Sequence, residues 1–325
     1  MHPLFKDISS LPTERINPAT VDIDVLPTRE IVALLHAEDA RVIPAVGAEL
    51  AHIAAAVDLI VAAFQRGGRL IYVGAGTSGR LGVVDASECP PTFGTAPEMV
   101  QGIIAGGSAA MFRSQEGVED SRDAGAAALD DVQVKSEDVV CGIAASGRTP
   151  FVLGALARAR ARGCKTIFVS TSTPENIRGR GVEVDVLICP QVGPEPIAGS
   201  TRMKSGTAQK LVLNMLTTAA MVRIGKTYHN VMVDLQLSNG KLEARARRTV
   251  MEVCGVDYDE AERALTNCGG HVKTAIVSLI AGVNCNEART RLARADGRVR
   301  AALRDSAADQ TGDKQKNHLK GEDAA

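Results

Sequence analysis

The chain has 325 residues, enough for about two domains of ordinary size with a buried core. Lys and Arg total 37 against 38 Asp and Glu, and this balance excludes a net field that attracts nucleic acid or an anionic membrane. The N-terminus lacks the apolar core of a signal peptide, and the longest apolar stretch, LVLNMLTTAAMVRIG, is too short to span a bilayer. We therefore expect a cytoplasmic protein that holds its ligand by local contacts.

Helices are predicted before and after a central region of short strands. Residues 27–64 have apolar residues at helical spacing. Between residues 70 and 190, the apolar runs LIYVGAG, MVQGIIAGG, VVCGIAASG, TIFVSTS and VDVLICP alternate with helical segments. Near-continuous apolar strands separated by helices indicate a parallel sheet that is covered on both faces. The expected fold class is α/β, with three αβα layers.

The C-terminal third is expected to be all-helical. A long helix is predicted at about residues 205–224, and a small all-α unit at about 250–303. The last residues carry almost nothing apolar, as in a disordered tail. We expect four regions: an N-terminal extension with helices (1–59), the sheet domain (60–225), a helical C-terminal region (226–303) and the tail (304–325).

The cysteines and histidines do not suggest a metal site. The seven cysteines include no C-x-x-C pair and mostly stand in or beside apolar runs, as small buried hydrophobic residues do. The six histidines include no His-x-x-x-His pair. We expect neither a metal nor a cofactor.

Hydroxyl side chains follow three of the predicted strands. The first strand is followed by Gly76-Thr77-Ser78, the third by Ser146-Gly-Arg148-Thr149, and the fourth by Ser170-Thr-Ser172. Parallel sheets bind ligands at the carboxyl ends of their strands, and glycines with helix N-termini there favour phosphate. Turn and cap residues explain any one of these clusters, but they explain three successive clusters poorly. We predict a small phosphorylated ligand.

The segment Gly74-Ala-Gly76-Thr-Ser-Gly79 also fits the dinucleotide fingerprint G-x-G-x-x-G. That interpretation requires an acidic residue about 20 positions further on, at the end of the second strand, to hold a ribose. The second strand ends in IIAGG, without an acid. A phosphomonoester is therefore favoured over NAD.

These residues resemble a known family. The glycine loop and Ser146-Gly-Arg-Thr149 look like the sugar isomerase (SIS) phosphosugar-binding fold. The segments GAGTSGRLGVVDASECPPTFG, EGVEDS, GIAASGRTP and GSTRMKSGTAQKLVLNML resemble the bacterial N-acetylmuramic acid 6-phosphate etherases, and the resemblance runs from about Thr13 to Leu303. It implies cleavage of the D-lactyl ether of that phosphosugar during cell-wall sugar recycling, a homodimer, and a C-terminal three-helix bundle similar to ubiquitin-associated (UBA) domains.

The resemblance also implies two catalytic glutamates. Glu88, expected in a turn fixed by Pro90 and Pro91, would protonate the departing lactate and then activate water. Glu119, in EGVEDS, would remove the proton on carbon 2. This pair suits elimination, because in the open-chain sugar that proton is alpha to the aldehyde and the ether oxygen is a beta leaving group. Without the family, Glu88 is more often a solvated acid and Glu119 part of an acidic first helical turn.

Some residues and functions stay open at this stage. Arg202 and Lys204 either balance substrate charge or face solvent, and His229 either aids ring opening or is structural. The same fold also occurs in phosphosugar-binding regulators without chemistry and in aldose–ketose isomerases. We expect a small phosphosugar as the partner, without nucleic acid or membrane.

Overall fold

The computed structural model describes residues 11–234 and 240–304, so the predicted tail from residue 305 onward lies outside the described part. Contacts divide the chain into two compact units, one of residues 1–89 and 96–220 and the other of 90–95 and 221–325. The N-terminal helices belong to the same unit as the sheet. The four regions expected from the sequence remain a finer prediction.

The first unit contains a five-stranded sheet. Its strands have the order β2-β1-β3-β4-β5, and every pair is parallel. This confirms the predicted parallel sheet and all five predicted strands. The bounds are Leu70–Gly74 (β1), Val100–Ile104 (β2), Val139–Ile143 (β3), Lys165–Val169 (β4) and Val186–Ile188 (β5).

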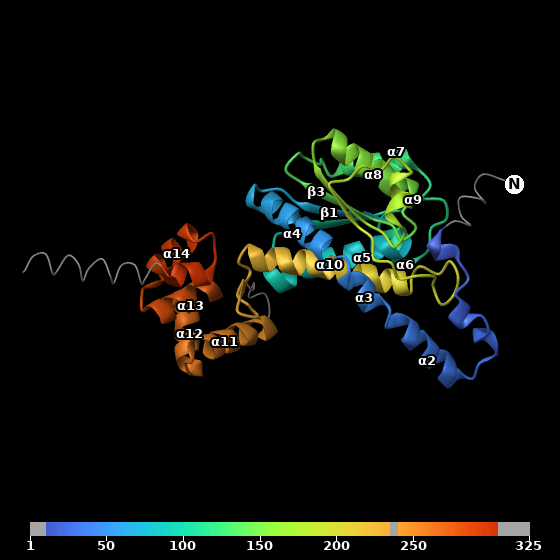
Figure 1. Cartoon of the computed structure of the whole chain (residues 1–325). Helices are drawn as coiled ribbons and strands as arrows, with labels where there is room; N and C mark the ends of the chain where they lie inside the picture. The colour runs from blue at the N-terminus through green and yellow to red at the C-terminus, as the bar shows by residue number, and fades with distance from the viewer. Residues whose placement is uncertain (1–10, 235–239, 305–325) are drawn as a thin grey trace, which may run out of the picture. The chain divides into compact units, whose positions relative to one another are not determined.

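Helices lie on both faces of this sheet, which gives the expected three layers (Figure 1). On one side are α7 (Arg122–Asp131), α8 (Pro150–Ala161) and α9 (Pro174–Arg178), and on the other are α4 (Leu50–Gln65), α5 (Gly76–Phe93) and α10 (Lys204–Arg223). The short α6 (Ala109–Phe112) follows β2.

Successive side chains along a strand point alternately to the two faces of the sheet. Ile71 and Val73 of β1 join Val140 and Phe168 in a core that includes Leu156 of α8. Tyr72 points to the opposite face, where its hydroxyl meets α5. Burial on both faces explains why the strands read as continuous apolar runs.

The predicted N-terminal helical region is broken into α2 (Thr28–Asp39), α3 (Val42–Gly47) and α4. Pro44 lies in the first turn of α3 and has no N–H to donate to the carbonyl of Ala40, so α2 does not continue into α3. Three 3-10 turns precede α2, at Pro12–Glu14, Pro18–Thr20 and Ile23–Val25.

Within the described residues, no single helix is both long enough and apolar enough to span a membrane. The helical segments Thr28–Gly47 and Leu50–Gln65 reach that length and apolar composition only as a pair, and the pair is bent by 61°.

The second unit begins with a hairpin of β6 (Thr227–Tyr228) and β7 (Val231–Met232). Four helices follow, α11 (Gly240–Cys254), α12 (Tyr258–Asn267), α13 (Val272–Ala281) and α14 (Cys285–Arg294), around a core that includes Val250, Leu265 and Ile276. The helices predicted for about residues 250–303 are confirmed, whereas the hairpin lies within the region 226–303 that was expected to be helical. The likeness to UBA domains stays a prediction.

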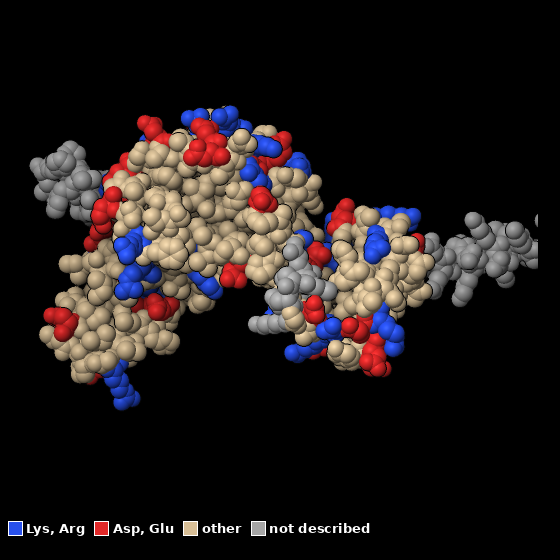
Figure 2. All heavy atoms as spheres, turned by 180° about the vertical axis from the view of Figure 1, so that it is seen from behind, with Lys and Arg blue, Asp and Glu red and all other residues tan. Residues whose placement is uncertain are grey.

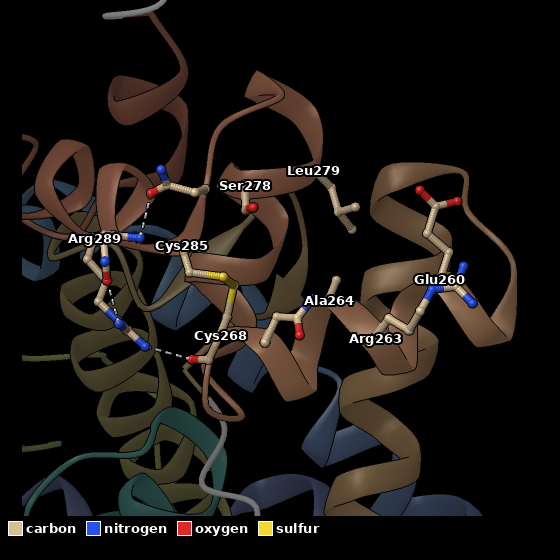
Figure 3. Close-up of a pocket in the computed structure, with 11 residues that line it drawn as sticks. Glu260, Arg263, Ala264, Cys268, Ser278, Leu279, Cys285 and Arg289 are labelled. Carbon is tan, nitrogen blue, oxygen red and sulfur yellow. Dashed lines mark hydrogen bonds between the residues drawn. A yellow bond between two sulfur atoms is a disulfide. The ribbon is translucent and has the colours of Figure 1, made fainter.

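The cysteines do not all behave as predicted. Cys268 and Cys285 form a disulfide that joins the end of α12 to the start of α14 (Figure 3), so these two are not free buried thiols. The two residues are 17 apart in sequence, and only the packing of α12, α13 and α14 brings them together.

A buried ion pair ties α10 to α2 in the first unit. Nζ of Lys204 lies 2.6 Å from a carboxylate oxygen of Glu38, and both side chains are almost fully buried. Glu38 also accepts from Asn17 and pairs with Arg41. Burial alone raises the pKa of Glu38, but the hydrogen bonds from Lys204 and Asn17 outweigh it and lower the pKa. Lys204 therefore neither faces solvent nor is free to balance substrate charge.

We predict that Lys204→Met lowers the free energy of unfolding by about 3–5 kcal/mol, because it leaves a buried carboxylate without its main partner. The exposed pair Lys165–Asp185 provides the control, and Lys165→Met should cost about 0–1 kcal/mol. Chemical denaturation measures both. The lowered pKa of Glu38 gives stability that is present above its unfolded pKa and lost as the pH falls through the folded pKa. The difference in the free energy of unfolding between the wild type and Lys204→Met should therefore become smaller in acid. Equal costs for both variants would contradict the prediction.

Candidate functional site

The loop from β1 to α5 forms the first part of the site. Gly76 has a φ of +53°, which favours glycine, and it begins α5 with Thr77 and Ser78 in the first turn. A Cβ on Gly79 would lie 2.8 Å from the carbonyl oxygen of Gly74, so only glycine lets the helix start this close to the strand. The N-terminus of α5, with its partial positive charge, therefore lies at the carboxyl end of β1.

The loop after β3 forms the second part. Ser146, Arg148 and Thr149 are half-buried there and lead into α8. Thr149 occupies the N-cap position, but its side chain makes no capping hydrogen bond. Its hydroxyl and a second helix N-terminus thus lie at the same edge of the sheet as the α5 loop, because β1 and β3 are adjacent and parallel.

The hydroxyls after β4 are buried more deeply. Ser170 donates to the carbonyl of Ala145 at 3.0 Å and accepts from the amide of Ser172 at 3.1 Å. Neither serine side chain is exposed. The β4 segment supports the β3 loop from behind, and a direct contact of Ser170 and Ser172 with phosphate stays a prediction.

The start of α10 also lies at the carboxyl edge of the sheet. The sequence analysis did not predict this, because it considered only the residues that follow each strand. Ser205 accepts from Thr171 at 2.9 Å, and buried Glu195 accepts from the backbone amides of Lys204 and Ser205. One turn further, Oε1 of Gln209 accepts from the Ser78 hydroxyl at 2.9 Å. A sequence signal existed, because Gln209 is a polar residue on the apolar stripe that includes Val212 and Leu213.

A buried carboxylate fixes the position of α5. Asp85 accepts from the hydroxyl of Tyr72 on β1 at 2.9 Å and from Asn214 and Thr217 on α10 at 2.6 and 3.3 Å. Burial and Asp85 raise the pKa of Tyr72 well above its ordinary value, so the phenol keeps its proton. Burial, with Asp85 and Glu88, raises the pKa of the Cys89 thiol to about 12, which leaves it without thiolate character.

Glu119 lies beside the β3 loop. Its carbonyl accepts from the amide of Phe151 at 3.0 Å, so the backbone of the EGVEDS segment is joined to the first turn of α8, which follows the Ser146–Thr149 loop. Burial, Asp120 and Glu116 raise the pKa of its carboxyl. The side chain is nevertheless exposed, so water screens part of that repulsion. Of the two predicted glutamates, Glu119 is the one whose backbone contacts the start of the helix that follows the β3 loop.

Glu88 does not lie in a turn, contrary to the sequence prediction. It is part of α5, which continues through Pro90 and Pro91 to Phe93. A proline removes one intrahelical hydrogen bond, and two near the C-terminal end of this long helix are tolerated. At about 1.5 Å per residue, Glu88 lies about 15 Å along the helix from Ser78. One chain therefore does not bring Glu88 to its own α5 N-terminus.

Arg202 is exposed, and His229 belongs to the second unit, where its ring contacts Tyr228 and Arg300. Among the described residues, no group of three or more His, Cys, Asp or Glu is arranged to hold a metal ion.

A separate pocket of about 560 Å³ opens in the second unit beside the disulfide and contains no predicted site residue (Figure 3). Arg289, on its wall, donates to the carbonyl of Cys268 and to Asn286.

Comparison with known proteins first gives the class. Residues 52–160 match the family model described as the glucokinase regulatory protein N-terminal SIS domain. Together with the parallel sheet and its loops, this match places the chain among α/β proteins with a SIS domain.

Curated relatives identify the family within that class. The chain is 60% identical over 301 residues to an N-acetylmuramic acid 6-phosphate etherase of Salinibacter ruber, covering 92% of this chain and 96% of the relative. An etherase of Mesorhizobium japonicum is 52% identical, with 94% and 99% covered. The chain belongs to the N-acetylmuramic acid 6-phosphate etherase family.

Among solved structures, a phosphoheptose isomerase from Neisseria gonorrhoeae is 19% identical, with a TM-score of 0.45 and coverage of 60% of this chain and 98% of that one.

The acidic neighbours of Glu119 lead to a prediction on pH. The role predicted for Glu119, removal of the proton on carbon 2, requires a deprotonated carboxyl. If Glu119 has that role, kcat/KM should rise with pH through its raised pKa. Replacing Glu116 by Gln and Asp120 by Asn removes two repelling charges, which should lower that pKa and move the rise to lower pH. Burial remains, so the shift should be partial. A pH–rate profile measures it, with Glu98→Gln as an exposed control; an unmoved profile would contradict the prediction.

Proposed function

We propose that this chain cleaves the D-lactyl ether of N-acetylmuramic acid 6-phosphate, giving N-acetylglucosamine 6-phosphate and D-lactate in cell-wall sugar recycling. The observation that carries the proposal is the position of Glu119 in a member of this family. The carboxyl of Glu119 has a raised pKa, and its backbone is hydrogen-bonded to the first turn of α8, one of the two helices whose N-termini suit a phosphate.

The phosphate orients the substrate in this proposal. Backbone amides at the starts of α5 and α8, with the hydroxyls of Thr77, Ser78, Ser146 and Thr149, bind the 6-phosphate. Gly76, Arg148, Ser170 and Ser172 complete the predicted binding set. Because the phosphate is remote from carbons 2 and 3, these groups position the sugar and leave proton transfer to the glutamates.

The reaction begins on the open-chain aldehyde. Glu119 removes the proton on carbon 2, the electron pair forms a carbon 2–carbon 3 double bond, and the carbon 3–oxygen bond breaks. Glu88 protonates the departing oxygen, which leaves as the hydroxyl of D-lactate. Glu88, now a carboxylate, then takes a proton from water as the water oxygen adds to carbon 3. The exposed carboxyl of Glu119 exchanges its proton with solvent and then donates a proton to carbon 2.

We predict that in ¹⁸O-water the label enters the carbon 3 hydroxyl of the product, because the ether oxygen leaves with lactate. In deuterated water, carbon 2 of the product should gain deuterium. Isotope-shifted carbon signals locate the oxygen label apart from exchange at carbon 1. Label in the lactate hydroxyl with none at carbon 3 would overturn the elimination–addition route.

The same measurement separates two other functions of this fold. An aldose–ketose isomerase would exchange the carbon 2 proton but release no lactate. A phosphosugar-binding regulator would bind the product without either change. Lactate release by the purified protein is therefore the deciding test of the proposed activity.

A homodimer completes the proposed site. Glu88 lies about 15 Å along α5 from Ser78, which is further than a hexose phosphate extends from its phosphorus to carbon 3. The face of α5 that carries Glu88 is open in one chain, with Val84, Ser87, Glu88 and Pro91 exposed at helical spacing. We infer that a second copy covers this face and that Glu88 acts on sugar bound by its partner.

Exposed apolar side chains support this inference. Val84 is 51% exposed on α5, and Ile16, Val21, Val25 and Val32 are exposed on the segment from the first turns to α2. Covering such exposed apolar side chains with another protein surface removes them from water, which favours association.

We further propose a cytoplasmic location without nucleic acid or membrane partners. Acidic and basic side chains are interspersed on the face seen in Figure 2, and the net charge is −1.

Mixing two inactive variants tests the shared site. Ser78→Asp places a negative charge in the phosphate cradle, and Glu88→Gln removes the acid. If Glu88 serves the partner's sugar, each mixed dimer has one intact site and one doubly defective site. Random exchange of equal amounts makes half of the dimers mixed, so about a quarter of the wild-type activity should return.

Lactate release after unfolding and joint refolding measures the recovery, and separately refolded variants provide the control. Joint refolding that gives mixed dimers but no activity would show that Ser78 and Glu88 serve the same protomer's site.

A further inference from the structure

Ser78 and Gln209 form a buried pair beneath the start of α5. The two residues are 131 apart in sequence, and their side chains are 7% and 1% exposed. Oε1 of Gln209 accepts the Ser78 hydroxyl proton at 2.9 Å. Nε2 of Gln209 is buried and has no hydrogen-bond partner among the described residues. A buried amide donor without a partner is costly, so it marks an interaction that this state of the protein leaves unmade.

The pairing competes with phosphate binding. A serine hydroxyl has one hydrogen to donate, and the oxygens of a phosphate dianion only accept. While Ser78 donates to Gln209, it has no hydrogen for the phosphate. Binding through Ser78 therefore requires that its proton leave Gln209.

A half-turn of the Gln209 carboxamide resolves the conflict. The rotation exchanges Oε1 and Nε2, which are nearly equal in size, so the surrounding packing is unchanged. Nε2 then donates to the Ser78 oxygen, Oε1 takes the place that Nε2 left, and the hydroxyl proton is free to point at the phosphate. A donor to the oxygen also strengthens that hydroxyl as a donor.

We propose that Gln209 is a positioning residue that switches the Ser78 hydroxyl from donating to the protein to donating to the phosphate of the ligand. The inference rests on the proposed function, since it takes a sugar phosphate as the ligand of the α5 N-terminus. Gln209 acts through Ser78 and does not touch the reacting carbons.

Two substitutions at this position separate the switch from packing. In Gln209→Glu the carboxylate accepts but does not donate, so it holds the Ser78 proton. Gln209→Met has a similar shape and no acceptor, so Ser78 keeps its proton for the phosphate. We expect the affinity for N-acetylglucosamine 6-phosphate, measured by calorimetry, to fall about 10- to 100-fold in Gln209→Glu and to stay within about threefold in Gln209→Met. Equal losses would assign Gln209 to packing and overturn the proposal.

The Ser78→Ala background removes the effect of charge alone. A new carboxylate also repels phosphate directly, and that repulsion remains when Ser78 is absent. Gln209→Glu should therefore cost clearly less affinity in the Ser78→Ala protein than in the wild type. Equal costs in both backgrounds would mean that charge explains the loss, and the proposal would fail. The affinity of Gln209→Glu relative to wild type should also recover as the pH falls and its carboxyl becomes a donor.

A measurement on the unmodified side chain keeps the test independent of whether Gln209→Glu folds. With ¹⁵N-labelled protein, the side-chain amide signal of Gln209 is assigned by its loss in Gln209→Met. It should shift when N-acetylglucosamine 6-phosphate or inorganic phosphate binds, and it should not shift in Ser78→Ala. Gln101, on β2 with a bond to the carbonyl of Glu98, provides the matched control. A Gln209 signal that is unmoved at saturation would overturn the switch.

The outcomes also separate this inference from the proposed function. If the Gln209 signal shifts with phosphate but the protein releases no lactate, the result supports the switch and contradicts the etherase activity. If the protein releases lactate and the signal does not shift, the result supports the etherase activity and contradicts the switch.

Discussion

The close packing of α5 against β1 is the constraint on which the rest of the site depends. Gly74 and Gly79 let the helix begin almost in contact with the strand that precedes it. Asp85 then holds the helix by accepting from Tyr72 on β1 and from Asn214 and Thr217 on α10. A buried carboxylate with three donors is stable only in one arrangement, because losing a partner leaves a charge unpaired in the interior. The direction of α5 is therefore set along much of its length.

A helix held in this way serves two places at once. Ser78 lies at its N-terminus, beside the loops after β1 and β3, and Glu88 lies near its other end on an open face. Because the helix keeps Ser78 and Glu88 far apart, we propose that Glu88 acts on sugar bound by the other protomer. The same packing of α5 also makes α10 part of the binding region, since the helix that anchors Asp85 carries Gln209 to Ser78. The buried Lys204–Glu38 pair secures the start of α10 in turn.

Much of the site was predictable, and the failures have definite causes. The strands and the hydroxyls that follow them were predicted because apolar runs and turn residues are local patterns. Glu88 was placed in a turn because two adjacent prolines usually end a helix, whereas here the helix continues for two more residues after Pro91. Gln209 was missed because a single polar residue on an apolar stripe does not reveal its partner. The disulfide was missed because an odd number of cysteines in separate apolar runs carries no sign of pairing.

The sequence by itself determined the order and type of the elements, the parallel sheet, the hydroxyls at its carboxyl edge, and the resemblance that led to the family. These follow from periodicity and motifs that extend over a few neighbouring residues. The tertiary structure alone decided which distant side chains meet, such as Ser78 with Gln209 and Lys204 with Glu38, 131 and 166 residues apart. It also decided that the backbone of Glu119 lies against the start of α8, while Glu88 lies far along α5 from Ser78. The physical reason is that local propensity fixes backbone conformation, whereas such pairings depend on how helices pack across a sheet, which no short stretch of sequence encodes.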